Sequence, residues 1–245
     1  MIEIRDLVKT YDGFAAVDGL SLSVAAGEIV GLVGPNGAGK TTTLRCLAGI
    51  LPPTAGRIVV DGHDLQAEPV EARRRLAFVP DEPRLFENLT VMDHMKVIGR
   101  IYGVADAPER SRQLLAALEL ADRHDAFPAE LSRGMKQKLM IGLALLHRPG
   151  ALILDEPLTG LDPGAIRRMK RTIVEQAQAG AAVLVSSHLL ALVQEVCGRV
   201  VIVQRGRQVL AGSLTEIRAA LPGLDADADL EEIFLRATEG EPGAG

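Results

Sequence analysis

The segment Gly34-Pro35-Asn36-Gly37-Ala38-Gly39-Lys40-Thr41 matches the pattern G-x-x-x-x-G-K-[ST] at every defined position. The run 29–33 before it predicts a buried strand, and residues 42–48 after it predict the first turns of a helix. Strand, loop and helix in this order form the context in which the pattern binds phosphate. The alternative is a glycine-rich turn that binds nothing, and both flanking elements disfavour it.

The chemistry of this loop follows from its residue types. Its three glycines let the backbone fold back and aim N–H groups at phosphate oxygens. The start of the following helix adds a partial positive charge. We expect Lys40 to reach the β- and γ-phosphates of a nucleotide, and Thr41 to bind Mg²⁺ through its hydroxyl group. The predicted nucleotide contacts are Gly34, Pro35, Asn36, Gly37, Ala38, Gly39, Lys40, Thr41 and Thr42.

Bulk composition limits the class of protein. The chain has 245 residues, 47% apolar and 24% charged, which predicts a sizeable core in one domain with an inserted subdomain. A net charge of −5 disfavours nucleic acid as the main partner, and we interpret the basic clusters 73–75 and 167–171 as solvated helix surface. Cys46 and Cys197 lack metal-ligand spacing and fit a reducing cytosol. Neither a signal peptide nor an apolar run long enough to span a membrane is expected, so another chain would do the spanning.

Two aromatic residues lie close to the start of the chain, where alternating apolar and polar residues predict short strands. Tyr11 and Phe14 fall in the first connection between these strands. A flat ring beside a nucleotide pocket can stack on adenine. We expect this role for Tyr11 more than for Phe14; the alternative is an aromatic residue of the core or its rim.

A helical pattern runs from residue 89 to about residue 148 with no strand signal, which predicts a helical subdomain inserted between two strands of the nucleotide core. Near its end, Ser132 is a good N-cap for the helix that follows. The cap alone can explain this serine, and so can a helix N-terminus that binds phosphate. The spacing does not decide between the two.

Two carboxylates follow the apolar run 151–154, which predicts a strand buried on both faces. Ligands of open parallel sheets bind at the carboxyl ends of the strands, where Asp155 can hold Mg²⁺ and Glu156 can orient or polarise a water molecule. The alternative is a strand-end carboxylate that caps the next helix. A second buried strand, 181–185, leads to His188 at the same edge, and we expect this histidine to contact the γ-phosphate rather than merely to start a helix.

These motifs together resemble the nucleotide-binding subunits of ABC transporters over about residues 2–212. The phosphate loop is followed by a signature at 131–135, a Walker B strand at 152–155 with Glu156, a D-loop at 160–162 and a switch histidine, His188. Tyr11 matches the adenine-stacking aromatic residue of the family. A phosphate loop alone is shared by many NTPases, whereas the combination is specific.

The resemblance implies an α/β fold with a P-loop NTPase (RecA-like) core, an antiparallel β subdomain and an inserted α-helical subdomain. The ATPase domain would cover 1–212, with the helical subdomain at about 89–148 and a C-terminal helical extension with a flexible tail at 213–245. Family members pair head to tail around two ATP molecules, so that Ser132 and Gly134 would contact the γ-phosphate held by a partner subunit. Catalysis would rest on Lys40, Glu156 and His188.

The resemblance also implies partners and a location. The chain would hydrolyse ATP to drive transport through separate membrane-spanning permease subunits, and would lie in the cytoplasm on the inner face of the membrane. We expect the loop 81–91, with Pro83, Leu85, Phe86 and Leu89, to dock on the permease; the alternative is that these residues only pack the loop.

Two departures from the family pattern stand out. The signature has Arg133 and Met135 where glycine and glutamine are usual, a form that resembles the export branch. Asp81 stands where the family has a glutamine. A carboxylate there can ligate Mg²⁺ but adds negative charge beside phosphates and Glu156, so we expect reduced or more tightly coupled turnover.

Two other functions compete with transport. A soluble ABC ATPase that acts on ribosomes or DNA would be expected to carry two nucleotide domains or a long coiled coil. A regulatory module that binds ATP with little hydrolysis is disfavoured by the intact Lys40, Asp155, Glu156 and His188. The sequence leaves three questions open: which cargo is transported, whether it is imported or exported, and whether the dimer is a homodimer or a heterodimer.

Overall fold

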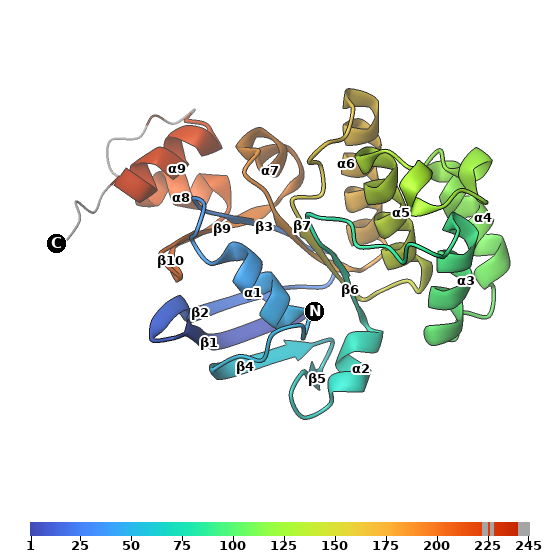
Figure 1. Ribbon diagram of the computed structural model, residues 1–245. Helices are drawn as coiled ribbons and strands as arrows, with labels where there is room; N and C mark the ends of the chain where they lie inside the picture. Colours follow the sequence, from blue (N-terminus) through green and yellow to red (C-terminus); the bar gives the residue numbers. More distant parts are fainter. Residues whose placement is uncertain (222–224, 226–227, 240–245) are drawn as a thin grey trace.

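The computed structural model describes residues 1–221, 225 and 228–239 and shows an α/β protein with two sheets (Figure 1). The larger sheet has the strand order β10-β9-β3-β8-β7-β6, and its strands are parallel except for β10. Strands β3, β7 and β8 are buried along their whole length, as their apolar sequences predict. The strands span Ile29–Val33 (β3), Leu76–Val79 (β6), Ala151–Asp155 (β7), Ala182–Ser186 (β8), Arg199–Gln204 (β9) and Arg207–Gly212 (β10).

The smaller sheet is antiparallel, with the order β2-β1-β4-β5. Helix α1 (Lys40–Leu47) lies between the two sheets (Figure 1) and buries Leu44, Cys46 and Leu47 in the core that joins them. Cys46 is fully buried there as a small apolar residue. The remaining elements of this part are β1 (Ile2–Tyr11), β2 (Phe14–Val24), β4 (Ala55–Val60), β5 (His63–Asp64) and α2 (Pro69–Arg74).

Three helices are inserted between β6 and β7: α3 (Val91–Ile101), α4 (Ala107–Ala117) and α5 (Arg133–Leu146), with short 3₁₀ turns η1 (Ala121–Arg123) and η2 (Pro128–Glu130). They pack on one another around Met95, Leu115 and Leu139, all fully buried. Side-chain caps define where α3 and α5 begin: Thr90 accepts from the backbone N–H of Asp93, and Ser132 from that of Met135. The α/β core, the antiparallel sheet and the helical insertion confirm the predicted fold class.

After β7 the chain adds further helices; the first of them lies beside α5, and the last two lie far from α3–α5 (Figure 1). They are α6 (Pro163–Gln178), α7 (Leu190–Val196), α8 (Leu214–Ala220) and α9 (Leu230–Glu239). Leu230 and Ile233 of α9 are buried in a cluster that also holds Val33 and Val193. The predicted tail lies outside the described residues except for Glu239, whose backbone still belongs to α9. The predicted domain limits stay a prediction, and no helix in the described ranges is long and apolar enough to cross a membrane.

Candidate functional site

A polar cavity of about 480 Å³ lies at the carboxyl ends of β3, β7 and β8, where α/β sheets bind ligands. It gathers most of the residues that the sequence predicts for a nucleotide site. The residues that line it are Phe14, Ala16, Asn36, Gly37, Ala38, Gly39, Lys40, Thr41, Thr42, Asp81, Asp155, Glu156, Thr159 and His188. Distant segments, from the first hairpin to β8, therefore meet in one place.

The phosphate loop has the backbone that its glycines predict. Gly37 and Gly39 adopt left-handed φ values of 80° and 98°. A side chain at Gly39 would also collide with the chain, because its Cβ would lie 2.3 Å from the carbonyl oxygen of Ala16. The loop is therefore closed against the first hairpin in a way that only glycine allows.

Lys40 is bonded to its own loop. Its Nζ donates to the carbonyl oxygens of Gly34 at 2.6 Å and Pro35 at 3.2 Å. Burial lowers the pKa of Lys40, and the nearby carboxylates of Glu156 and Asp155 oppose this shift. The ammonium group is thus held at the cavity by neutral carbonyl partners that an anionic phosphate can replace.

Asp155 ends strand β7 and is only 3% exposed. Its Oδ1 accepts a hydrogen bond of 2.5 Å from the hydroxyl group of Ser186 on the neighbouring strand β8. A buried carboxylate must be paired or must face a cation. The Ser186 bond orients this one and leaves acceptor capacity at the edge of the cavity.

Glu156 follows directly in a left-handed conformation with φ 49°, an uncommon backbone for glutamate. Its backbone N–H donates to the carbonyl oxygen of Ser186 at 3.0 Å. Its carboxylate accepts from His188 Nδ1 at 2.7 Å and from the Ser187 hydroxyl at 3.3 Å. The sharp turn therefore places the carboxylate against the end of β8.

Electrostatics at Glu156 favour a basic carboxylate. Burial raises the pKa of Glu156, while His188 and, more weakly, Lys40 lower it, and the net shift is upward. A carboxylate with a raised pKa takes up a proton more readily than an exposed one. This is the property that a general base needs.

Sequence reasoning missed Ser186 and Ser187. Each contacts one of the two carboxylates, and Ser187 also accepts from the backbone N–H of Leu189 at 3.1 Å. Both serines are at most 1% exposed. The available signal was a pair of hydroxyl residues that ends an apolar strand at the same sheet edge as Asp155 and Glu156.

The adenine-stacking expectation for Tyr11 stays a prediction. Tyr11 and Phe14 are paired across the first hairpin, and both rings are exposed, at 42% and 68%. Phe14 lines the cavity, whereas Tyr11 is not among its lining residues. The Nζ of Lys9 lies 5.1 Å from the centroid of the Tyr11 ring.

The signature residues lie outside this cavity. Ser132 caps α5 through a 3.3 Å bond from the Met135 N–H, so the cap interpretation is confirmed. Gly134 sits against the D-loop, since a Cβ there would lie 3.2 Å from the carbonyl oxygen of Gly160. Contact of Ser132 and Gly134 with a phosphate of another subunit stays a prediction.

The donor set in the cavity fits Mg²⁺. The hydroxyl group of Thr41 and the carboxylates of Asp81 and Asp155 line the same space, and Mg²⁺ prefers oxygen ligands. Among the described residues no group of three or more His, Cys, Asp or Glu side chains could hold a metal by itself. A magnesium ion would therefore need phosphate oxygens as well, as is usual for this ion.

Comparison with known proteins identifies the family. The family described as ABC transporter matches residues 17–159, more than half of the chain. The ABC-type transporter ATP-binding protein EcsA of Bacillus subtilis is 35% identical over 99% of this chain and 98% of its own length. The daunorubicin/doxorubicin resistance ATP-binding protein DrrA of Streptomyces peucetius is 37% identical over 90% of this chain and 67% of its own length. A solved structure described as the ATP binding subunit of an ABC transporter superimposes with a TM-score of 0.93 at 38% identity, covering 97% of this chain and 99% of that chain. The chain therefore belongs to the ABC transporter family, as one of its ATP-binding subunits.

Proposed function

We propose that this chain binds ATP with Mg²⁺ and hydrolyses it to drive export through separate membrane-spanning subunits. The observation that carries hydrolysis is the Glu156–His188 hydrogen bond at the wall of the cavity that also holds Lys40. Export is supported by relatives whose names include drug resistance and Nod factor export. The cargo itself is chosen by the membrane-spanning subunits.

The phosphate loop supplies the binding energy for ATP. Its N–H groups and the start of α1 attract the phosphates, and Lys40 exchanges its bonds to Gly34 and Pro35 for the β- and γ-phosphate oxygens. Thr41 and Asp155 would hold Mg²⁺, with Asp81 as a third oxygen donor. When bound, Mg²⁺ neutralises charge on the β- and γ-phosphate oxygens.

Glu156 and His188 carry the chemical step. Glu156 orients a water molecule and accepts its proton as the water oxygen bonds to the γ-phosphorus and the bond to the β-phosphate oxygen breaks. The products are ADP and inorganic phosphate. His188 donates from Nδ1 to Glu156. Its Nε2 can donate to a γ-phosphate oxygen only when both ring nitrogens carry a proton, so that contact requires the protonated imidazole.

A second ATP-binding subunit completes the site in this proposal. Ser132 and Gly134 lie at the start of α5 and do not line the cavity of their own chain. A helix N-terminus is suited to phosphate, so they would serve the cavity of a head-to-tail partner. A solved cassette of the same fold, 24% identical with a TM-score of 0.78, is described as dimeric in a post-hydrolysis state bound to ADP and Pi.

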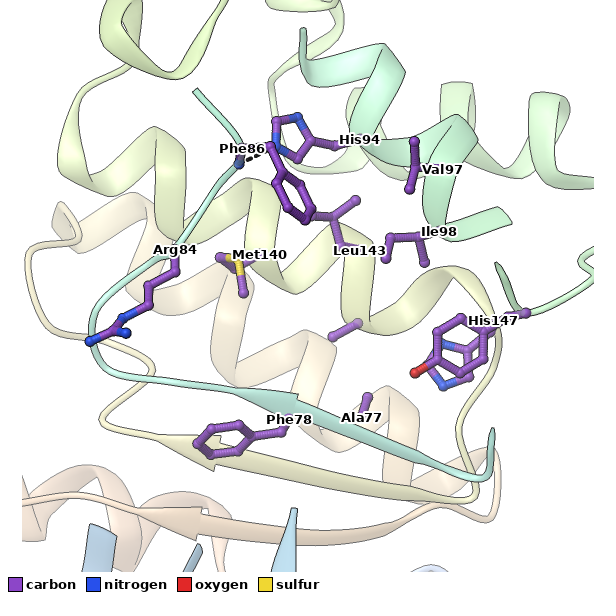
Figure 2. A pocket seen from close by; sticks show the side chains of 12 residues that line it. Ala77, Phe78, Arg84, Phe86, His94, Val97, Ile98, Met140, Leu143 and His147 are labelled. Atoms are coloured by element: carbon purple, nitrogen blue, oxygen red, sulfur yellow. Dashed lines mark hydrogen bonds between the residues drawn. The ribbon is translucent and has the colours of Figure 1, made fainter. Parts of the chain in front are cut away.

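The permease would dock in an apolar groove beside the loop 81–91. The groove encloses about 190 Å³ between this loop, β6 and the inserted helices. Figure 2 shows Phe86 and His94 beside Leu143 and Ile98, with the guanidinium group of Arg84 turned away from these side chains. The residues that line it are Ala77, Phe78, Arg84, Phe86, His94, Val97, Ile98, Tyr102, Met140, Leu143, Ala144 and His147.

His94 holds the loop of this groove in place. Its Nε2 accepts from the backbone N–H of Phe86 at 2.9 Å, and its Nδ1 donates to the carbonyl oxygen of Thr90 at 2.7 Å. Phe86 nevertheless stays 65% exposed. A large exposed aromatic side chain on a braced loop suits a protein partner.

The test compares ATP hydrolysis by the purified chain with that of Glu156→Gln, in Mg²⁺ and in EDTA. We expect the variant to lose at least about 100-fold in turnover, because a general base contributes that much, and to elute as a dimer with ATP. Glu175→Gln, an exposed carboxylate on α6, is the matched control. Equal turnover in Glu156→Gln and in the wild type would overturn the proposed mechanism.

A further inference from the structure

The two departures from the family pattern lie in contact. The Nη2 of Arg133 is 3.5 Å from Oδ1 of Asp81, although the residues are 52 positions apart. Asp81 follows β6 and lines the nucleotide cavity. Arg133 is the first residue of α5, directly after the Ser132 cap. One ion pair therefore joins the start of the signature helix to the wall of the nucleotide site.

The stem of Arg133 also rests on the D-loop. Gly160 has φ 77°, and a Cβ there would lie 3.3 Å from Cδ of Arg133 and 3.4 Å from its Nε. The side chain thus passes over a glycine that leaves room for it, and then reaches Asp81. Three segments meet at Arg133: the loop after β6, the D-loop and the N-terminus of α5.

This pair cannot matter much for folding. The side chains of Arg133 and Asp81 are 55% and 45% exposed, and exposed ion pairs contribute little to the free energy of unfolding. Its effect is on charge inside the cavity. The carboxylate of Asp81 faces the same space as Asp155, Glu156 and the incoming phosphates, where an added negative charge opposes the binding of an anion.

We propose that Arg133 is a positioning residue for the nucleotide site. Its guanidinium group holds the Asp81 carboxylate at the cavity wall and offsets its charge, so that ATP can enter beside a residue that would otherwise repel it. The inference rests on the proposed ATP site and adds a role for an arginine that is not among the residues lining the cavity of its own chain. It also gives a physical reason for the two departures to occur in one chain: the Arg133 cation offsets the Asp81 anion.

The test is a double-mutant cycle on the affinity for ATP, measured with a fluorescent ATP analogue in EDTA so that Mg²⁺ does not contribute. Arg133→Ala should weaken binding by about five-fold, the upper end for an exposed charge pair. The same change should have no effect when Asp81→Asn is already present, because no charge is left to offset. Arg133→Lys should restore most of the affinity, and about 1 M salt should shrink the coupling.

Controls separate this inference from the proposed function. Arg167→Ala removes an exposed cation from α6 and should leave the affinity unchanged. Thermal midpoints of all variants should match the wild type. Absence of ATP binding by the wild type would defeat the proposed function. The Arg133 proposal alone would be overturned if Arg133→Ala weakened ATP binding by the same factor in the wild-type chain and in the Asp81→Asn variant.

Discussion

The imidazole Nδ1 of His188 lies 2.7 Å from Oε2 of Glu156, across the ends of neighbouring strands β8 and β7. A carboxylate can only accept, so the histidine donates from Nδ1 and its Nε2 is free. The backbone of Glu156 is left-handed, and its N–H is bonded to the Ser186 carbonyl oxygen. The strand ends therefore impose the geometry of the pair.

Ser187 is expected to be a positioning residue for Glu156. Ser187→Ala removes the 3.3 Å bond to the carboxylate and the 3.1 Å bond from Leu189 N–H. Net hydrogen bonds are worth about 0.5–1.5 kcal/mol, so turnover should fall by about 2- to 10-fold. Steady-state ATPase kinetics should show this fall in kcat with KM almost unchanged. Ser187→Thr keeps the hydroxyl group and should recover activity; an equal loss in both variants would contradict this role.

Gly39 is expected to tolerate no side chain. Gly39→Ala would place Cβ 2.3 Å from the Ala16 carbonyl oxygen in a left-handed backbone with φ 98°, so the phosphate loop must move. We expect loss of ATP binding in an equilibrium titration. Gly198→Ala is the matched control, because its Cβ would meet nothing within 4 Å and its backbone is not left-handed. Normal ATP affinity in Gly39→Ala would show that the loop is not held against the hairpin.

Local patterns predicted much of the fold and of the site. Uninterrupted apolar runs predicted β3, β7 and β8, because both faces of these strands are buried. The carboxyl ends of parallel strands share one edge, so residues that follow such runs could be placed together without coordinates. This argument predicted that Asp155, Glu156 and His188 lie together, and all three line one cavity.

Side-chain contacts between loops could not be predicted in this way. The Arg133–Asp81 pair depends on how α5 is seated against the loop after β6, and no local pattern encodes that seating. The sequence also could not predict that the aromatic ring lining the cavity is that of Phe14. The register of the first hairpin pairs Tyr11 with Phe14, and three-dimensional placement, not sequence spacing, decides which ring lines the pocket.

His147 is expected to make stability depend on pH. Its ring stacks on Tyr102 with centroids 3.8 Å apart, and its Nε2 donates to the Leu76 carbonyl oxygen at 3.2 Å. Burial lowers the pKa of His147. Below about pH 6.5 this histidine is therefore protonated more fully in the unfolded chain than in the folded one. This contribution to stability is therefore present at neutral pH and is lost as the pH falls from about 6.5. Urea unfolding at about pH 5 and pH 7.5 should show a smaller difference for His147→Gln than for the wild type. An unchanged difference would assign the pH dependence to other groups.

Ile233 is expected to anchor the C-terminal helix α9. It is fully buried beside Val33, the residue before the phosphate loop, and Val193 of α7. When α9 unfolds together with the core, Ile233→Ala should lower the free energy of unfolding by about 2–5 kcal/mol. This is the usual cost of the cavity that such a truncation leaves. Leu235→Ala on the same helix is the control, since Leu235 is 47% exposed and should change stability by less than about 0.5 kcal/mol. Urea denaturation measures both variants. A cost below 1 kcal/mol for Ile233→Ala, with α9 amides exchanging freely, would show that α9 opens on its own and that Val33 does not depend on it.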